Sequence, residues 1–105
     1  PSAGSVPALV ADAAPDDVAV VGAFHSLAAG RLADLDADLD VDTLVLADDE
    51  AAKDTVAGLA EDIDGLRALD AGGLANAAEV ESLTPLLINV AQRNDDLWDL
   101  GVRFQ

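Results

Sequence analysis

Residues 43–69, TLVLADDEAAKDTVAGLAEDIDGLRAL, decide the fold that the sequence predicts. Thr43 to Ala47 is a short apolar run bounded by polar residues, which predicts a buried strand. A helical segment follows, with an apolar face at helical spacing formed by Val56, Leu59, Ala60 and Ile63. Asp64-Gly65 is expected to end that helix, and Leu66 to Leu69 predicts another short strand. A strand, a helix and a strand in this order indicate the α/β class.

The start of this helix is marked by acidic residues. Asp48 is expected to cap it, because a carboxylate accepts hydrogen bonds from the free N–H groups of the first turn. Asp49 and Glu50 would then lie in the first turn, where the positive end of the helix dipole favours negative charge.

Upstream, the sequence predicts a short helix and a strand. Val6 to Ala14 has helical spacing, with Val6, Leu9 and Val10 on one face, and Pro15-Asp16-Asp17 is a turn signal. Val18 to Phe24 is rich in valine and predicts a buried strand. Ser26 to Leu32 is expected to form a short helix or turn.

The acidic alternation from Asp34 to Asp42 resembles a calcium-binding loop. Starting at Asp34, Asp36 or Asp38, however, it offers neither glycine at the sixth position nor glutamate at the twelfth, which an EF-hand loop requires. The run is therefore predicted to be a solvated acidic connection.

Downstream, Ala77 to Asn94 predicts a long helix, and Asn76 and Glu79 have the spacing of a capping box at its start. Pro85 inside it predicts a kink. The apolar positions of this helix are Val80, Leu83, Leu86, Leu87, Ile88, Val90 and Ala91. Because they cover more than one stripe, we expect burial on more than one side. Gly101 to Phe104 is expected to be a closing strand, which completes a small α/β domain of short strands and a long buried C-terminal helix.

Composition limits the possible functions. The 105 residues suffice for one domain, and the chain has no methionine, so we expect it to be part of a longer product. A net charge of −16 opposes binding to nucleic acid or anionic membranes. Scattered carboxylates favour adaptation to high salt over an acidic patch for a cationic partner. The absence of cysteine and the single histidine argue against a metal site. No apolar run is long enough to span a bilayer, so we expect a cytoplasmic protein.

Candidate site residues follow the predicted strands. Ligands of open α/β sheets bind at the carboxyl ends of strands, so His25, Ala47-Asp48 and the loop from Asp70 to Gly73 are expected to converge on one site. His25 has a simpler alternative, in which it ends a strand and bonds a nearby carbonyl. Gly72-Gly73 also has two explanations: close approach of a flat ring, or a tight turn before the helix.

Several segments resemble one enzyme family, the F420-dependent NADP oxidoreductases. Residues 65–77, GLRALDAGGLANA, are similar to that family's G-L-R-x-L-D-A-G-P-L-x-N-A segment, and residues 80–89, VESLTPLLIN, to its following helix. Further likenesses are Val21 to Leu27 with V-x-A-(F/L)-H-T-(I/V), Ala47 to Glu50 with G-D-D-E, and Leu100 to Phe104 with L-G-(I/V)-(K/R)-F. Two departures stand out: Gly73 replaces the usual proline, and Ala47 the usual glycine.

The resemblance implies hydride transfer between coenzyme F420 and NADP. In the family, an N-terminal Rossmann domain holds NADP, and a smaller C-terminal domain closes a largely apolar cleft over the deazaflavin. Residues 1–105 would be that second domain, from a salt-loving archaeon, without the NADP-binding half and therefore inactive alone. By the resemblance, the cofactor-binding residues are His25, Ser26, Leu27, Gly72, Gly73 and Leu74, no residue is assigned as catalytic, and the 77–94 helix forms a homodimer interface. The alternative is a free-standing binding or dimerisation domain without redox activity.

Overall fold

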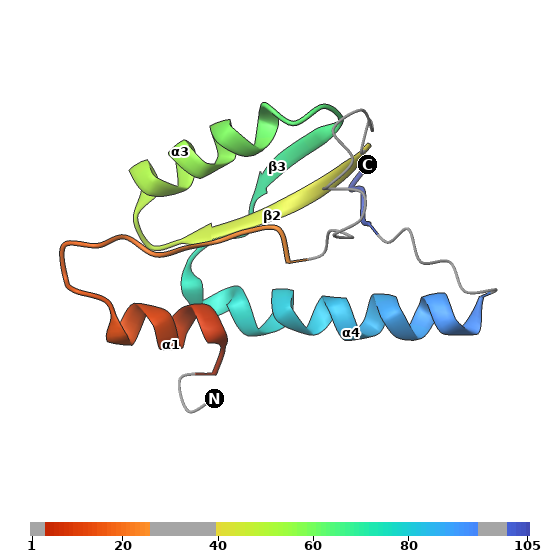
Figure 1. The fold of residues 1–105 in the computed structure, drawn as a ribbon, viewed down its shortest axis with the longest axis horizontal. Helices are drawn as coiled ribbons and strands as arrows, with labels where there is room; N and C mark the ends of the chain where they lie inside the picture. The colour runs from red at the N-terminus through yellow and green to blue at the C-terminus, as the bar shows by residue number, and fades with distance from the viewer. Residues whose placement is uncertain (1–3, 26–39, 95–100) are drawn as a thin grey trace.

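The computed structural model describes residues 4–25, 40–94 and 101–105. Its elements, in chain order, are α1 (Val6–Ala13), β1 (Val21–Gly22), β2 (Val41–Ala47), α3 (Glu50–Glu61), β3 (Leu66–Asp70), the 3-10 helix η1 (Leu74–Asn76) and α4 (Ala77–Arg93) (Figure 1). The fold is a small α/β domain, as predicted. The proposed helix or turn from Ser26 to Leu32 and most of the acidic run after it lie outside the described residues.

β2 is the central strand of the sheet, whose order in the described residues is β1-β2-β3. β3 pairs with β2 in parallel, from Val41 with Leu66 to Val45 with Asp70. β1 pairs with the other edge of β2 in the antiparallel direction, with Val21 opposite Ala47. The β2-α3-β3 unit predicted from residues 43–69 is therefore confirmed.

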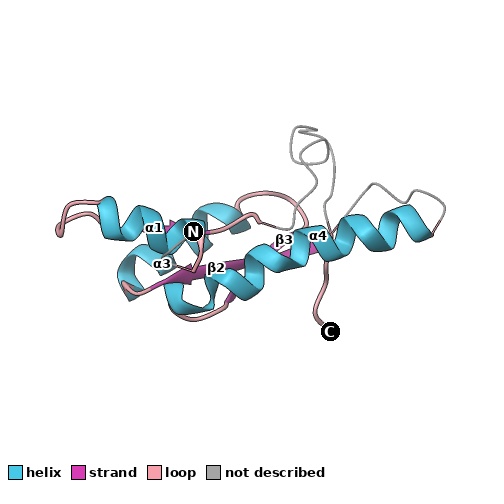
Figure 2. Ribbon diagram, turned by 90° about the horizontal axis from the view of Figure 1, so that it is seen from below, coloured by secondary structure: helices cyan, strands magenta, loops and turns pink. Residues whose placement is uncertain are grey.

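The sheet is covered on both faces. α3 lies over one face, and α1 and α4 lie along the other (Figure 1), an arrangement that is also visible from below (Figure 2). Leu46 is fully buried on the α4 side, where it packs with Leu74, Ala77 and Val80. A second cluster, on the α3 side, is built around Ala60 and Leu66. The apolar residues of β2 and β3 thus bury both faces of a parallel pair, as expected for this class.

The strand predicted over Val18 to Phe24 is wrong in extent, since β1 contains only Val21 and Gly22 and Val18 is 53% exposed. At the start of β1, Val21 is already opposite Ala47, the last residue of β2, so Val18 to Val20 have no partner on that strand. At its end, Phe24 has a positive φ of 65°. Its backbone N donates to the Thr43 side chain at 2.9 Å instead of continuing the ladder with the backbone of β2. The chain therefore turns away from the sheet before His25.

Two expectations for α3 are also wrong. The helix is capped by Asp49, whose side chain accepts from Ala52 N at 3.0 Å, and not by Asp48. The backbone of Asp49 is still extended, so the helix begins one residue later than predicted. In addition, Leu59 is 64% exposed whereas Lys53 is buried, because the helix turns the face that contains Lys53 and Ala60 toward the sheet.

α4 begins at Ala77 and has the predicted length, but it lacks the predicted capping box and the predicted burial. Asn76 is helical (φ −89°, ψ 0°) because η1 leads directly into α4, and it makes no side-chain cap. Its amide donates instead to Ala71 O at 2.9 Å. Within the described part of the chain the helix is buried on one side only; the exposed apolar residues are Leu86, Ile88 and Val90. The kink expected at Pro85 stays a prediction.

The C-terminal segment reaches the sheet at one point. Val102 forms an isolated antiparallel bridge with Asp42, so the closing strand predicted over Gly101 to Phe104 is reduced to one residue pair. Gly101 permits this approach, because a Cβ at that position would lie 2.5 Å from Val41 Cγ1.

Salt is expected to raise the unfolding midpoint. Most described carboxylates are exposed on a chain of net charge −16, so screening relieves their mutual repulsion. Thermal unfolding followed by circular dichroism between low and molar potassium chloride measures the effect. A midpoint that stayed constant or fell would contradict adaptation to high salt.

Candidate functional site

His25 lies between the sheet and α4. The residue before His25 is Phe24, whose backbone N donates a hydrogen bond to the side chain of Thr43 in β2. The hydroxyl of Thr84 in α4 donates to His25 O at 2.6 Å. Thr43 is fully buried, so the first of these bonds is shielded from water. Two threonines, from a strand and a helix far apart in sequence, therefore fix the backbone around His25.

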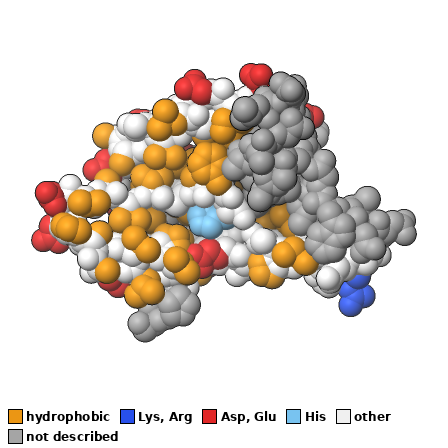
Figure 3. All heavy atoms as spheres, viewed as in Figure 1, with side chains coloured by type: hydrophobic (Ala, Val, Ile, Leu, Met, Phe, Trp, Pro, Cys, Tyr) orange, Lys and Arg blue, Asp and Glu red, His pale blue; other side chains and the backbone are white. Residues whose placement is uncertain are grey.

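The imidazole of His25 packs against the glycine of β1. A Cβ at Gly22 would lie 3.1 Å from His25 Cε1 and 3.2 Å from Leu46 Cδ1, so the missing side chain makes room for the ring. Nδ1 is buried and has no hydrogen-bond partner among the described residues. The simpler explanation of this residue, a bond to a nearby carbonyl, is therefore not realised through Nδ1. In Figure 3 the pale blue histidine side chain is visible at the surface, with an acidic side chain directly below it and hydrophobic side chains further out.

The loop after β3 is bound to the end of β2. Ala71 N donates to Val45 O at 2.9 Å, and Ala47 N donates to Gly72 O at 3.1 Å. Asp70 turns back on this loop, with Oδ1 accepting from Gly72 N at 2.7 Å. Leu74 then enters the core and is 6% exposed. The Ala47-Asp48 strand end and the Gly72-Gly73 loop thus meet, as predicted.

The two loop glycines are required by packing within the chain. A Cβ at Gly72, where φ is +90°, would lie 2.7 Å from Asn76 Nδ2, and a Cβ at Gly73 would lie 2.6 Å from Asp48 Oδ1. The tight-turn explanation of Gly72-Gly73 therefore accounts for both residues without a ligand.

The predicted convergence of three strand ends is wrong. Because β1 is antiparallel to β2, it leads His25 away from the Gly72 loop. Thr84, which bonds His25 O, lies about 10 Å along α4 from Ala77 at 1.5 Å per residue. Leu46 lies near both places, because its side chain and the His25 ring approach the same glycine, Gly22, and Leu46 packs with Leu74. Ser26 and Leu27 lie outside the described residues.

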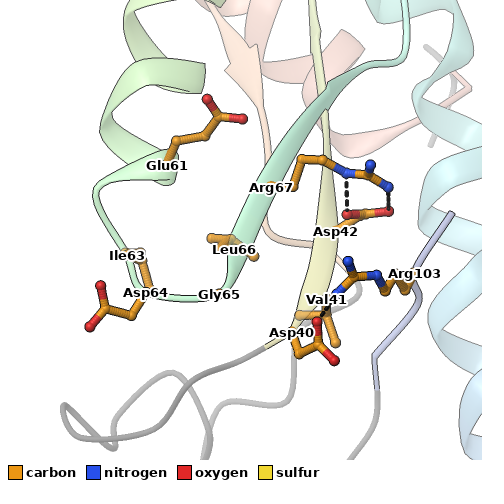
Figure 4. A pocket seen from close by; sticks show the side chains of 10 residues that line it. All are labelled: Asp40, Val41, Asp42, Glu61, Ile63, Asp64, Gly65, Leu66, Arg67 and Arg103. Atoms are coloured by element: carbon orange, nitrogen blue, oxygen red, sulfur yellow. Dashed lines mark hydrogen bonds and ion pairs between the residues drawn. The ribbon is translucent and has the colours of Figure 1, made fainter. Parts of the chain in front are cut away.

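Hollows lie at both ends of the parallel strands. One of about 410 Å³ lies at the carboxyl end of β2, bordered by Asp48 and Leu74 and by Val18 to Val20. Another of about 420 Å³ lies at the opposite end of the pair, between Asp42, Arg67 and Arg103 (Figure 4). Among the described residues, no group of three or more possible metal ligands is present, and none of the helices is long and apolar enough to span a membrane.

The arginines of the second hollow are engaged within the chain. Arg67 makes two bonds of 2.8 Å to Asp42, which is 2% exposed, and Arg103 pairs with Asp40. The Arg67 guanidinium holds the pKa of the Asp42 carboxyl below its usual value, although burial opposes this. Asp42 also accepts from Phe104 N at 2.6 Å. These groups attach the C-terminal segment to the sheet and are not free to bind an anion.

Lys53 is the ionic group that the sequence patterns missed. Its ammonium is 3.0 Å from Asp70 Oδ1 and 3.2 Å from Glu50 Oε1, although its side chain is only 5% exposed. Asp70 raises the pKa of Lys53, with a further contribution from Glu50. The pKa of Asp70 is lowered by the bond from Gly72 N and by Lys53. The sequence contains one signal for the burial of Lys53: at helical spacing it lies on the same face as Ala60.

Replacing Gly72 with alanine is expected to destabilise the chain by about 1 to 2 kcal/mol, because an L-residue is strained at positive φ. The contact with Asn76 adds to this cost. Chemical denaturation of Gly72→Ala measures it, with Gly58→Ala as the control, because a Cβ at the exposed helical Gly58 meets no atom within 4 Å. Equal effects of the two changes would contradict the loop geometry.

The Lys53–Asp70 pair is expected to make part of the stability dependent on pH. A lowered Asp70 pKa contributes stability above the ordinary value of about 3.9, which is lost as pH falls through the pKa of the folded state. The raised Lys53 pKa keeps its contribution complete below about 10.4. The difference in unfolding midpoint between the unchanged chain and Lys53→Met should therefore be constant near neutrality and shrink below about pH 4. A difference that did not change in acid would exclude Asp70 as the partner.

The sequence of this chain is similar to those of three known enzymes. Over 75 residues, 71% of the chain, the sequence is 45% identical to the F420-dependent NADP reductases of Methanothermobacter marburgensis and Methanothermobacter thermautotrophicus. Over 90 residues, 86% of the chain, it is 42% identical to the F420-dependent NADP reductase of Methanocaldococcus jannaschii. The match spans 34%, 32% and 40% of these relatives, respectively. No protein-family model matches the sequence.

Proposed function

We propose that this chain is the F420-side part of an oxidoreductase that transfers a hydride between coenzyme F420 and NADP. The observation that carries the proposal is the identity of 42–45% with F420-dependent NADP reductases over most of the chain. Because only 32–40% of those enzymes is matched, we propose that NADP is held by a separate Rossmann domain of the same protein.

The surroundings of His25 fit the proposed cofactor. Nδ1 is a buried polar atom without a partner among the described residues, and the side chain lies at a surface with apolar side chains further out (Figure 3). Buried polar atoms in folded proteins nearly always have partners. Because protein atoms cover Nδ1, we propose that the ligand displaces this cover on binding and supplies the missing partner. Held by Thr43 and Thr84, His25 would orient or polarise the deazaflavin.

Other residues have supporting roles in this proposal. Leu27 would pack against a ring and Ser26 would lie beside it. Because β1 leads His25 away from the loop of Gly72, Gly73 and Leu74, we propose that this loop binds a different part of F420. When bound, F420 and NADP supply the hydride chemistry, and this chain orients the reacting rings and excludes water.

Exposed apolar side chains support an interface. Leu86, Ile88 and Val90 are exposed on α4, and Val6, Leu9 and Val10 are exposed on α1. We propose that the 77–94 helix forms a homodimer and that the protein works in the cytoplasm of a salt-rich cell. The same α4 side chains favour the second candidate function, a free-standing dimerisation domain without redox activity.

A chimera tests the proposed function. The N-terminal part of the Methanothermobacter marburgensis reductase, up to the start of the similarity, is joined to this chain, and F420 reduction by NADPH is followed by absorbance. We expect the chimera to be active and this chain alone, or the N-terminal part alone, to be inactive.

A folded chimera that binds NADPH but neither binds nor reduces F420 would contradict the proposal. If the isolated chain then sedimented as a dimer without affinity for F420, the dimerisation domain would be the better account.

A further inference from the structure

Lys53 is buried although a lysine on a surface helix normally extends into water. It is the only lysine among 5 basic residues, and its side chain is 5% exposed. Taking an ammonium out of water is costly unless partners replace the water. Its partners therefore indicate what the burial achieves.

Two of those partners are Asp70, the last residue of β3, and Gly72 in the loop that follows it. Lys53 Nζ donates to Asp70 Oδ1 at 3.0 Å and lies 3.5 Å from Gly72 O. Asp70 Oδ1 also accepts from Gly72 N at 2.7 Å. The ammonium thus joins the carboxylate and the carbonyl that surround the left-handed Gly72.

Asp48 holds the other end of the same loop. Its Oδ1 accepts from Leu74 N at 3.0 Å, and the space it occupies beside Gly73 is the space a Cβ would fill. Asp48 and Lys53 both come from the β2–α3 junction, so one short segment fixes Gly72 and Leu74.

We propose that Asp48 and Lys53 form a two-point clamp that positions the Gly72–Leu74 loop for F420 binding. Neither residue needs to touch the cofactor; both are positioning residues. The expected effect on F420 affinity rests on the proposed function, whereas the expected effect on the order of the loop does not. F420 affinity and loop order are therefore measured separately.

Four variants separate the clamp from general stability. Lys53→Met and Asp48→Ala remove the two bonds, whereas Lys53→Arg and Asp48→Asn keep a donor and an acceptor. Glu50→Gln is a further control, because Glu50 is a 77% exposed partner of Lys53 that bonds no loop atom. Amide hydrogen exchange measures the protection of the Gly72 and Leu74 N–H groups in this chain. A fluorescence titration measures the affinity of the chain for F420.

We expect Lys53→Met and Asp48→Ala to speed exchange at Gly72 and Leu74, respectively, roughly ten- to hundredfold. Exchange in the β2 core should not change, and F420 should bind about tenfold more weakly. Lys53→Arg, Asp48→Asn and Glu50→Gln should stay close to the unchanged chain.

Unchanged exchange at the loop in both disrupting variants would overturn the clamp. A loosened loop with unchanged F420 affinity would overturn its positioning role. If the unchanged chain did not bind F420, the proposed function would be contradicted, and exchange at Gly72 and Leu74 would still decide whether the clamp exists. If Lys53→Met did not fold, Asp48→Ala against Asp48→Asn would decide the same point at Leu74.

Discussion

Replacing Leu46 with alanine is expected to lower the free energy of unfolding by about 2 to 5 kcal/mol. Leu46 is fully buried on the central strand, and it packs with Leu74, Ala77 and Val80 from the elements that cover this face. Truncation removes buried apolar atoms and leaves a cavity that neighbours on a paired strand cannot easily fill. A loss of this size is a large part of the stability of a small domain.

Urea denaturation of Leu46→Ala against the unchanged chain measures the loss, at a salt concentration where both are folded. Leu59→Ala is the matched control, because the same side chain is 64% exposed on α3. That control should change stability by no more than about 0.5 kcal/mol. Equal losses in the two variants would mean that α3 turns a different face toward the sheet.

The control also shows where the sequence pattern was insufficient. Helical spacing groups Leu59 with Ala60, but spacing does not define how a helix rotates against a sheet. Here the small Ala60 faces the sheet, and Lys53 is buried with it because Asp70 supplies a compensating charge. That charge comes from another strand, so no local pattern contains it.

The sequence predicts β3, on one edge of β2, more accurately than β1 on the other edge, for a similar reason. The β2-α3-β3 unit follows from local composition and was predicted correctly, with β2 and β3 slightly longer than expected. β1 is short because β2 ends opposite Val21 and because Phe24 N bonds Thr43, and valine content indicates neither of these tertiary contacts. Its antiparallel direction also separates His25 from the Gly72 loop, although both follow strands in the sequence.

For the candidate site, the arrangement of the residues differs from the predicted one, and their role in binding stays a prediction. His25 was selected by its place after a strand, and it carries the buried Nδ1 without a partner among the described residues. Gly72-Gly73 has two explanations in the sequence, close approach of a ring or a tight turn, and the groups that lie close are Asn76 and Asp48. A Cβ does not fit at either position, but a glycine in the sequence does not indicate what occupies the space.

Replacing His25 in the active chimera is expected to lower kcat/KM for F420 by about a hundredfold, the order of loss that misplacement of a reacting group produces. His25→Ala removes the ring that packs against Gly22, so both the polar atom and the shape of the surface are lost. The kcat/KM for NADPH should change less, because the proposal assigns NADP to the other domain.

His25→Phe separates packing from polarity, because it keeps an aromatic ring but has no nitrogen. If Nδ1 bonds or polarises the cofactor, His25→Phe should lose nearly as much activity as His25→Ala. Thr43→Val is the control for displacement of the backbone, since it removes only the bond from Phe24 N. Full activity in His25→Phe, with a normal unfolding midpoint, would reduce His25 to a packing residue, and the unpartnered Nδ1 would then have no role in the reaction.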